Sequence, residues 1–233
     1  MTRRLVLFDI DGTLLLSGGA GRRAILAAIA EEGVEPEMVG HVRFDGKTDP
    51  QIVAELLDAG CHRGPYPPER IEAVIDRYLA NLEADLAVNA HQATVMPGVR
   101  PLLDLLHEDE RIVLGLLTGN VVRGARLKLE AVGLGADRFL VGAYGSDHGI
   151  RSELPPIAAA RAVPHFGRVP GGPEIVIIGD TPADVTCGQC VGARSVAVAT
   201  GGYTVDDLAG AGAHRVFPDL SDIATVHAAI FGD

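Results

Sequence analysis

Leu5-Val6-Leu7-Phe8-Asp9-Ile10-Asp11-Gly12-Thr13 is the stretch around which the rest of the sequence is organised. Its first four residues are all apolar, which is typical of a strand that is buried on both faces of a parallel sheet. The two-residue period of a strand places Asp9 and Asp11 on the same side of the chain, just past the carboxyl end of that strand. Two carboxylates this close repel each other, and a divalent cation or a shared proton would relieve the repulsion.

Composition bounds the class of protein. The chain has 233 residues, of which 47% are hydrophobic, so it can bury a substantial core as one large domain or as one domain with an insert. The net charge of −11 argues against nucleic acid or an anionic membrane as the main partner. No apolar stretch is long enough to span a bilayer or to serve as a signal peptide. Three cysteines are too few for a disulfide framework, so we expect a cytoplasmic protein.

Strands and helices are predicted to alternate along most of the chain. Further apolar runs suited to buried strands, each followed by a helical pattern, occur at 111–117, 139–142, 174–178, 195–198 and 215–217. A single helix is expected over 154–166, and Cys187 and Cys190 are expected to be small buried residues of a later helix. This alternation predicts an α/β fold with a doubly wound, Rossmann-like parallel sheet.

The alternation is interrupted after the first strand. Helical patterns, with no clear buried strand between them, cover 22–32, 51–59 and 69–86. We therefore predict a catalytic core built from 1–16 and 94–233 and an inserted all-helical cap domain over 17–93. Within the cap, Asp49 is expected to cap the helix that Pro50 begins.

Chemically useful side chains follow two more of the predicted strands. Thr118, Gly119 and Asn120 follow one of them, at the start of a helix whose free N–H groups favour an anion. Asp180 follows another, and Asp184 comes one helical turn later. Because ligands of open α/β sheets bind beyond the carboxyl ends of the strands, these groups are expected to meet Asp9 and Asp11.

In these features the sequence resembles the haloacid dehalogenase-like hydrolases, most of which are phosphatases, over nearly its whole length. Three motifs of the family match: DxDGT at residues 9–13, a hydrophobic strand that ends in Thr118, and GDxxxD at residues 179–184. The helical insert resembles the cap of the branch that contains phosphoglycolate phosphatases and β-phosphoglucomutase. In this family the first strand lies centrally, between the strands that carry the second and the fourth motif.

The third motif departs from the family pattern, which normally supplies a lysine ahead of a helix. Aligning Pro156 with the family's later proline puts Arg151 at the lysine position. Arginine keeps the positive charge and adds a planar fork suited to phosphate oxygens. The competing candidate is Lys128, whose simpler interpretation is a solvated lysine in the middle of a helix.

The resemblance implies a mechanism. Asp9 would be the nucleophile that forms an aspartyl-phosphate, and Asp11 would be the general acid and base. Magnesium would be held by Asp9, Asp180 and the backbone carbonyl of Asp11, with Asp184 contacting a metal-bound water or orienting Asp180. Phosphate oxygens would be bound at Thr118, Gly119, Asn120 and Arg151. Lys47, on a cap loop, would contribute to specificity, although it can equally be an exposed lysine on a turn.

The resemblance thus predicts a Mg²⁺-dependent phosphatase that acts on a small phosphomonoester through an aspartyl-phosphate. Two alternatives stay open: a phosphomutase of the β-phosphoglucomutase type, and a non-catalytic protein that binds a phosphometabolite. The second is weaker because all of the acidic residues are present. The sequence leaves the identity of the ester and the oligomeric state open.

Overall fold

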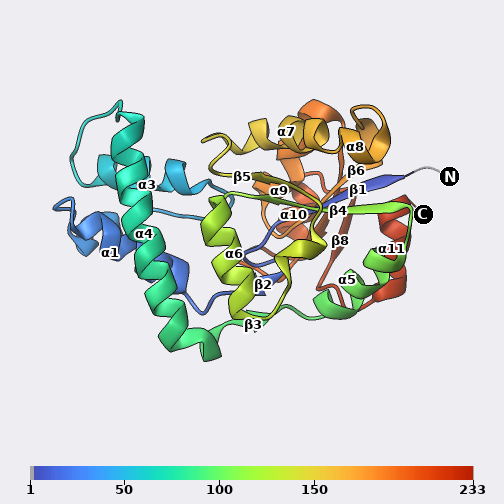
Figure 1. Ribbon diagram of the computed structural model, residues 1–233, viewed down its shortest axis with the longest axis horizontal. Helices are drawn as coiled ribbons and strands as arrows, with labels where there is room; N and C mark the ends of the chain where they lie inside the picture. Colours follow the sequence, from blue (N-terminus) through green and yellow to red (C-terminus); the bar gives the residue numbers. More distant parts are fainter. Residues whose placement is uncertain (1–2, 233) are drawn as a thin grey trace.

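The computed structural model describes residues 3–232 and contains a six-stranded parallel sheet in the order β5-β4-β1-β6-β7-β8 (Figure 1). Its strands are β1 (Arg4–Phe8), β4 (Ile112–Thr118), β5 (Val141–Tyr144), β6 (Ile175–Gly179), β7 (Arg194–Val198) and β8 (Arg215–Phe217). The prediction of a doubly wound α/β sheet is confirmed. So is the central place of the first strand, between β4 and β6.

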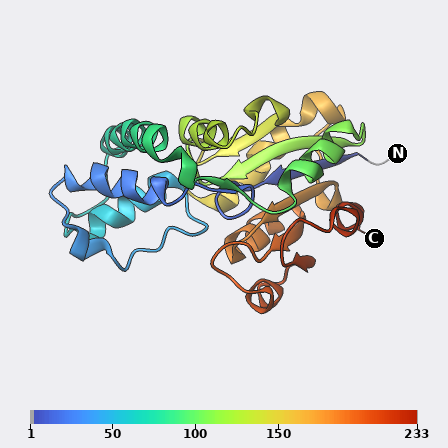
Figure 2. The same cartoon turned by 90° about the horizontal axis from the view of Figure 1, so that it is seen from below.

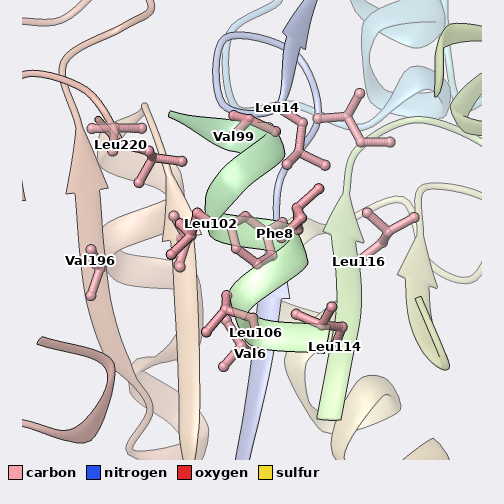
Figure 3. Close-up of a cluster of buried hydrophobic side chains, with 14 of the residues drawn as sticks. Val6, Phe8, Leu14, Val99, Leu102, Leu106, Leu114, Leu116, Val196 and Leu220 are labelled. Carbon is pink, nitrogen blue, oxygen red and sulfur yellow. The ribbon is translucent and has the colours of Figure 1, made fainter. Parts of the chain in front are cut away.

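Two layers of helices cover the sheet. Phe8 and Val6 of β1 pack against α5 (Val99–Glu108), in a cluster that also includes α6 (Val122–Ala131) and α11 (Ile223–Phe231) (Figure 3). Leu5 and Leu7 point to the other face, where α7 (Leu154–Arg161) and α9 (Pro182–Cys187) pack. The alternating residues of β1 are thus buried on both sides, which explains its uninterrupted apolar sequence. The remaining helices of the core are α8 (Val163–Phe166) and α10 (Val205–Gly210).

Residues 17–93, which we call the cap segment, lie at one end of the molecule (Figures 1 and 2). They form α1 (Ala20–Ala30), α2 (Pro36–Val39), α3 (Asp49–Ala59) and α4 (Pro68–Asn89), whose apolar residues make a second cluster that Val121, just before α6, joins. The short antiparallel strands β2 (Leu15–Leu16) and β3 (Thr94–Val95) join the cap segment to the rest of the chain. That the two parts are separate domains stays a prediction.

The register of the sheet brings the predicted site residues together. Phe8, the last residue of β1, lies beside Leu116 of β4 and Ile178 of β6. The three strands end within two residues of these positions, so the segments that follow them leave the sheet at the same edge, as expected for parallel strands. Gly12 lies close behind, with a φ of +84°, and a Cβ there would overlap the carboxylate of Asp180. Glycine is thus required both for the turn and for the close approach.

Several expectations about local structure are wrong. Residues 154–166 form two helices, because Pro164 cannot continue the hydrogen-bonding pattern of α7, and the break falls at Ala162. The strand expected at 139–142 begins at Val141 instead. Cys187 is buried but Cys190 is exposed, in a 3₁₀ turn after α9.

Among residues 3–232, no helix is both long and apolar enough to cross a membrane.

Candidate active site

The carboxyl edge of the sheet and the cap segment enclose a cavity of about 370 Å³. The cap segment supplies apolar and charged side chains to its wall, among them Arg22, Phe44 and Tyr78. The predicted site residues that line it are Asp9, Asp11, Lys47, Thr118, Gly119, Asn120, Arg151 and Asp180. Asp184 lies behind this wall, in contact with Arg151. The strand ends therefore converge as the sequence predicts.

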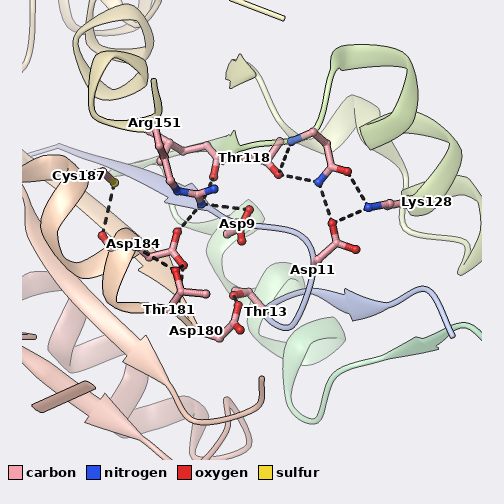
Figure 4. Close-up of polar contacts among 12 residues, drawn as sticks. Asp9, Asp11, Thr13, Thr118, Lys128, Arg151, Asp180, Thr181, Asp184 and Cys187 are labelled. Atoms are coloured by element: carbon pink, nitrogen blue, oxygen red, sulfur yellow. Dashed lines mark hydrogen bonds and ion pairs between the residues drawn. The ribbon is translucent and has the colours of Figure 1, made fainter. Parts of the chain in front are cut away.

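Asp9, Asp180 and Asp184 form a buried carboxylate cluster (Figure 4). Each offers an oxygen, and these oxygens lie within 4.8 Å of one another. Burial raises the pKa of Asp9 to about 6 and that of Asp180 to about 8, and repulsion between the carboxylates adds to both shifts. Thr13 Oγ1 donates a 2.8 Å hydrogen bond to Asp180 and so fixes one of the three side chains. A buried set of carboxylates that repel each other is suited to a hard divalent cation such as Mg²⁺.

Arg151 is the cation next to this cluster. It is only 7% exposed and forms an ion pair with Asp184, and its Nη2 lies 3.3 Å from Asp9 Oδ1. Although burial opposes its charge, Asp184 and Asp9 hold the pKa of Arg151 well above its usual value. Asp184 also accepts hydrogen bonds from the backbone N–H and the hydroxyl of Thr181. Arg151 thus lies beside the carboxylate cluster, and its role as the third-motif cation stays a prediction.

Asp11 turns away from the carboxylate cluster, toward Lys128 and Asn120 (Figure 4). Lys128 Nζ lies 2.6 Å from Asp11 Oδ2, and Asn120 Nδ2 donates to the same oxygen at 2.8 Å. Lys128 is 5% exposed, so its interpretation as a solvated helix lysine is wrong. Lys128 therefore pairs with Asp11, whereas Arg151 pairs with Asp9 and Asp184.

The turn after β4 presents the groups predicted to bind phosphate. Thr118 is fully buried, and its hydroxyl accepts a 2.9 Å hydrogen bond from Asn120 Nδ2. Gly119 lies against the cap segment, where a Cβ would overlap the carbonyl oxygen of Lys47. Only glycine therefore allows the cap segment to approach this turn so closely.

The loop before α3 docks on the core. Asp49 accepts a 2.8 Å hydrogen bond from the N–H of Val121, just before α6, and its own N–H donates to Gly119 O at 2.8 Å. Thr48, not Asp49, caps α3. The sequence did not reveal this contact, because Asp49 is the expected cap of its own helix and contacts a helix that begins more than seventy residues later.

Lys47 belongs to the same loop. Lys47 lines the cavity, and its ammonium forms an ion pair with Glu55 of α3. The charge of Lys47 is thus already paired within the cap segment. The role of Lys47 in specificity stays a prediction.

The burial of Asp49 leads to a prediction about stability. Burial raises its pKa to about 6, although Lys128 opposes the shift, and Asp11 and Tyr78 also face it. The folded state therefore holds this proton more tightly than the unfolded chain, whose pKa is near 3.8. Stability from this group is present below about pH 4 and is lost as the pH rises through 6.

Asp49→Asn removes that loss and keeps an oxygen for the Val121 N–H. The free energy of unfolding of Asp49→Asn, minus that of wild type, should therefore be about 2–3 kcal/mol larger at pH 7.5 than at pH 4. Urea unfolding at both pH values measures the change, and Asp45→Asn, on the exposed part of the loop, is the matched control. A constant difference between wild type and Asp49→Asn would contradict the assignment.

Comparison with known proteins shows what the chain is similar to. The family profile described as haloacid dehalogenase-like hydrolase matches residues 3–192. A phosphoglycolate phosphatase of Cereibacter sphaeroides is 31% identical over 226 residues, covering 92% of this chain and 96% of that protein. A phosphoglycolate phosphatase of Rhodospirillum rubrum is 30% identical, covering 94% and 89%.

Solved structures show the same fold. A hydrolase from Pseudomonas syringae has a TM-score of 0.72 at 23% identity and covers 98% of this chain and 99% of that one. CbbY from Rhodobacter sphaeroides, solved in complex with phosphate, has a TM-score of 0.71 at 20% identity, with 95% and 96% covered.

Proposed function

Because the chain belongs to the haloacid dehalogenase-like hydrolase family, we propose that it is a Mg²⁺-dependent phosphatase that acts on a small phosphomonoester through an aspartyl-phosphate. The observation that carries the proposal is the buried cluster of Asp9, Asp180 and Asp184, with Arg151 beside it, at the wall of the cavity. An anionic phosphate reaches an anionic carboxylate only where positive charge balances both.

The proposed reaction has two steps. A carboxylate oxygen of Asp9 attacks phosphorus in line, while the bond from phosphorus to the ester oxygen breaks and Asp11 donates a proton to the leaving alkoxide. Water then attacks the phosphorus of the acyl phosphate and loses a proton to Asp11, while the bond from phosphorus to the Asp9 oxygen breaks and frees the Asp9 carboxylate. Inorganic phosphate leaves, and both aspartates return to their starting states.

The other residues hold the transferring group. Thr118, Gly119 and Arg151 line the cavity, and their hydroxyl, backbone N–H and guanidinium would bind phosphate oxygens. We propose that Asn120 contributes mainly by orienting its neighbours, since its side chain already bonds to Asp11 and Thr118. Mg²⁺ held by Asp9, Asp180 and the carbonyl of Asp11 would neutralise charge on the phosphate, and Asp184 would orient this set through Arg151.

Phosphoglycolate is the first substrate to test. The curated relatives named above are phosphoglycolate phosphatases, and a cavity of about 370 Å³ suits a small ester. Arg22 in its wall adds positive charge that a second anionic group on the substrate would meet.

We expect phosphate release from a panel of phosphomonoesters to depend fully on the metal. Activity should fall to background in EDTA and return when Mg²⁺ is added in excess, because Asp9 and Asp180 would otherwise face the substrate as uncompensated carboxylates. Circular dichroism in EDTA controls for unfolding. Undiminished turnover in EDTA would contradict the metal assignment. An isomerised sugar phosphate in place of free phosphate would point to the mutase, and a folded protein that releases no phosphate would favour a binding role.

A further inference from the structure

Lys128 is a buried cation whose main partner is open to the cavity. The lysine side chain is 6% exposed, whereas the side chain of Asp11 is 41% exposed. A buried ammonium is costly unless it is paired and hydrogen-bonded, and Lys128 obtains both from Asp11 and from Asn120 Oδ1, which lies 2.6 Å away. A carboxylate at a cavity wall has no such need, because water can solvate it. The pair therefore gives the buried lysine its counter-charge and, at the same time, holds the exposed carboxylate of Asp11 in place.

The contacts on Asp11 restrict its rotation. Lys128 Nζ and Asn120 Nδ2 approach the same oxygen, Oδ2, at 2.6 Å and 2.8 Å. Lys128 and Asn120 also bond to each other, so the three side chains form a closed triangle. The second oxygen of Asp11 does not take part in this triangle.

The cap segment helps to hold the lysine. A Cβ on Gly21 of α1 would lie 3.3 Å from Lys128 Nζ, and the neighbouring Gly124 faces the hydroxyl of Tyr78 of α4. The turn that carries Asn120 is tied to the cap segment on both sides, by Asp49 at Val121 and at Gly119 O. The triangle thus forms where the cap segment and the core meet.

We propose that Lys128 is a positioning residue for Asp11: together with Asn120 it holds the carboxylate in the rotamer that reaches the leaving oxygen. The inference rests on the proposed function. Lys128 touches neither phosphate nor metal in this account, so its loss should affect only steps in which Asp11 moves a proton. This separates it from Arg151, which acts on the phosphoryl group itself.

The test compares esters that differ in their need for a proton. An alkyl ester such as phosphoglycolate requires protonation of its leaving oxygen, whereas p-nitrophenyl phosphate has a good leaving group and requires little. Lys128→Met should lower the rate of Asp9 phosphorylation, measured by rapid quench, by about 100-fold with the alkyl ester and by less than about 3-fold with the aryl ester. Lys128→Arg, which keeps a charged donor, should recover part of the loss.

Two further variants complete the design. In an Asp11→Asn background, Lys128→Met should lower the phosphorylation rate no further, because the carboxylate that Lys128 positions is already absent. Arg123→Met removes an ion pair between α6 and Glu83 of α4 without touching Asp11, and should leave the ratio of the two rates unchanged. Lys128→Gln replaces Lys128→Met if circular dichroism shows that the latter does not fold.

If Lys128→Met lowered the phosphorylation rate equally with both esters, or lowered it further in the Asp11→Asn background, the inference would be overturned. The proposed phosphatase function would be unaffected by either result. A wild-type protein that hydrolyses neither ester in Mg²⁺ would instead overturn the proposed function.

Discussion

Asp9→Asn is expected to lower phosphate release by at least about 10⁴-fold, the largest effect of any single substitution in this chain. The amide is nearly the same size as the carboxylate but is a very poor nucleophile, so no acyl phosphate forms. Asp9 directly follows β1, is 6% exposed, and has its Oδ1 3.3 Å from Arg151 Nη2. Steady-state phosphate release in Mg²⁺ measures the effect.

The loss should not come from unfolding. Burial and neighbouring carboxylates raise the pKa of Asp9 to about 6, so its ionised form is disfavoured in the folded protein without metal. Replacing it with a neutral amide relieves this repulsion, while Arg151 keeps Asp184 as its partner. The melting temperature of Asp9→Asn in EDTA should therefore equal or exceed that of wild type, as is common for residues kept for activity. An Asp9→Asn protein with more than a tenth of wild-type activity would rule out Asp9 as the nucleophile.

Arg151→Met is expected to have the second largest effect, lowering kcat by roughly 10²–10³-fold. The guanidinium is the cation beside the nucleophile, and methionine fills similar space without charge. The substitution also leaves Asp9 and Asp184 buried without their counter-charge, so the free energy of unfolding at pH 7.5 should fall by about 3–5 kcal/mol. Phosphate release and urea unfolding measure the two effects.

Arg151→Lys is the matched control. It restores a positive charge at the position where the family usually has lysine, but it loses the planar guanidinium, whose Nη2 contacts the carboxylates of both Asp9 and Asp184. Its kcat should lie between those of wild type and Arg151→Met, and it should recover most of the lost stability. If both variants lose activity equally, the shape of the guanidinium matters and not its charge. If neither loses more than about threefold, Arg151 has no part in transfer.

Much of the core could be predicted because its signals are local. The apolar runs before Asp9, Thr118 and Asp180 identify strands buried on both faces, and parallel strands bring their carboxyl ends to one edge. The short strands β2 and β3 could not be found in the same way, because two residues carry no periodic pattern. The break between α7 and α8 was signalled by Pro164, and a strict use of proline as a helix breaker would have found it.

The position of Lys128 was also readable from the sequence. It follows Val121 by seven residues and Ala125 by three, and both of these are buried, so helical periodicity places the lysine on the buried face of α6. A charged residue on such a face is a functional candidate. Asp49 gave no comparable signal, because its partner, the N–H of Val121, is brought to it only by the packing of the cap segment on the core.

The central claim is that phosphate passes through Asp9, and trapping the acyl phosphate tests it most directly. Asp11→Asn lacks the base for the second step, while p-nitrophenyl phosphate needs little acid for the first, so the intermediate should accumulate in this combination. We predict a burst of p-nitrophenol equal to the enzyme concentration. The phosphate should then be found on the peptide that contains Asp9 after acid quench, and neutral hydroxylamine should remove it. Turnover without a burst, and with no phosphate on that peptide, would contradict the account.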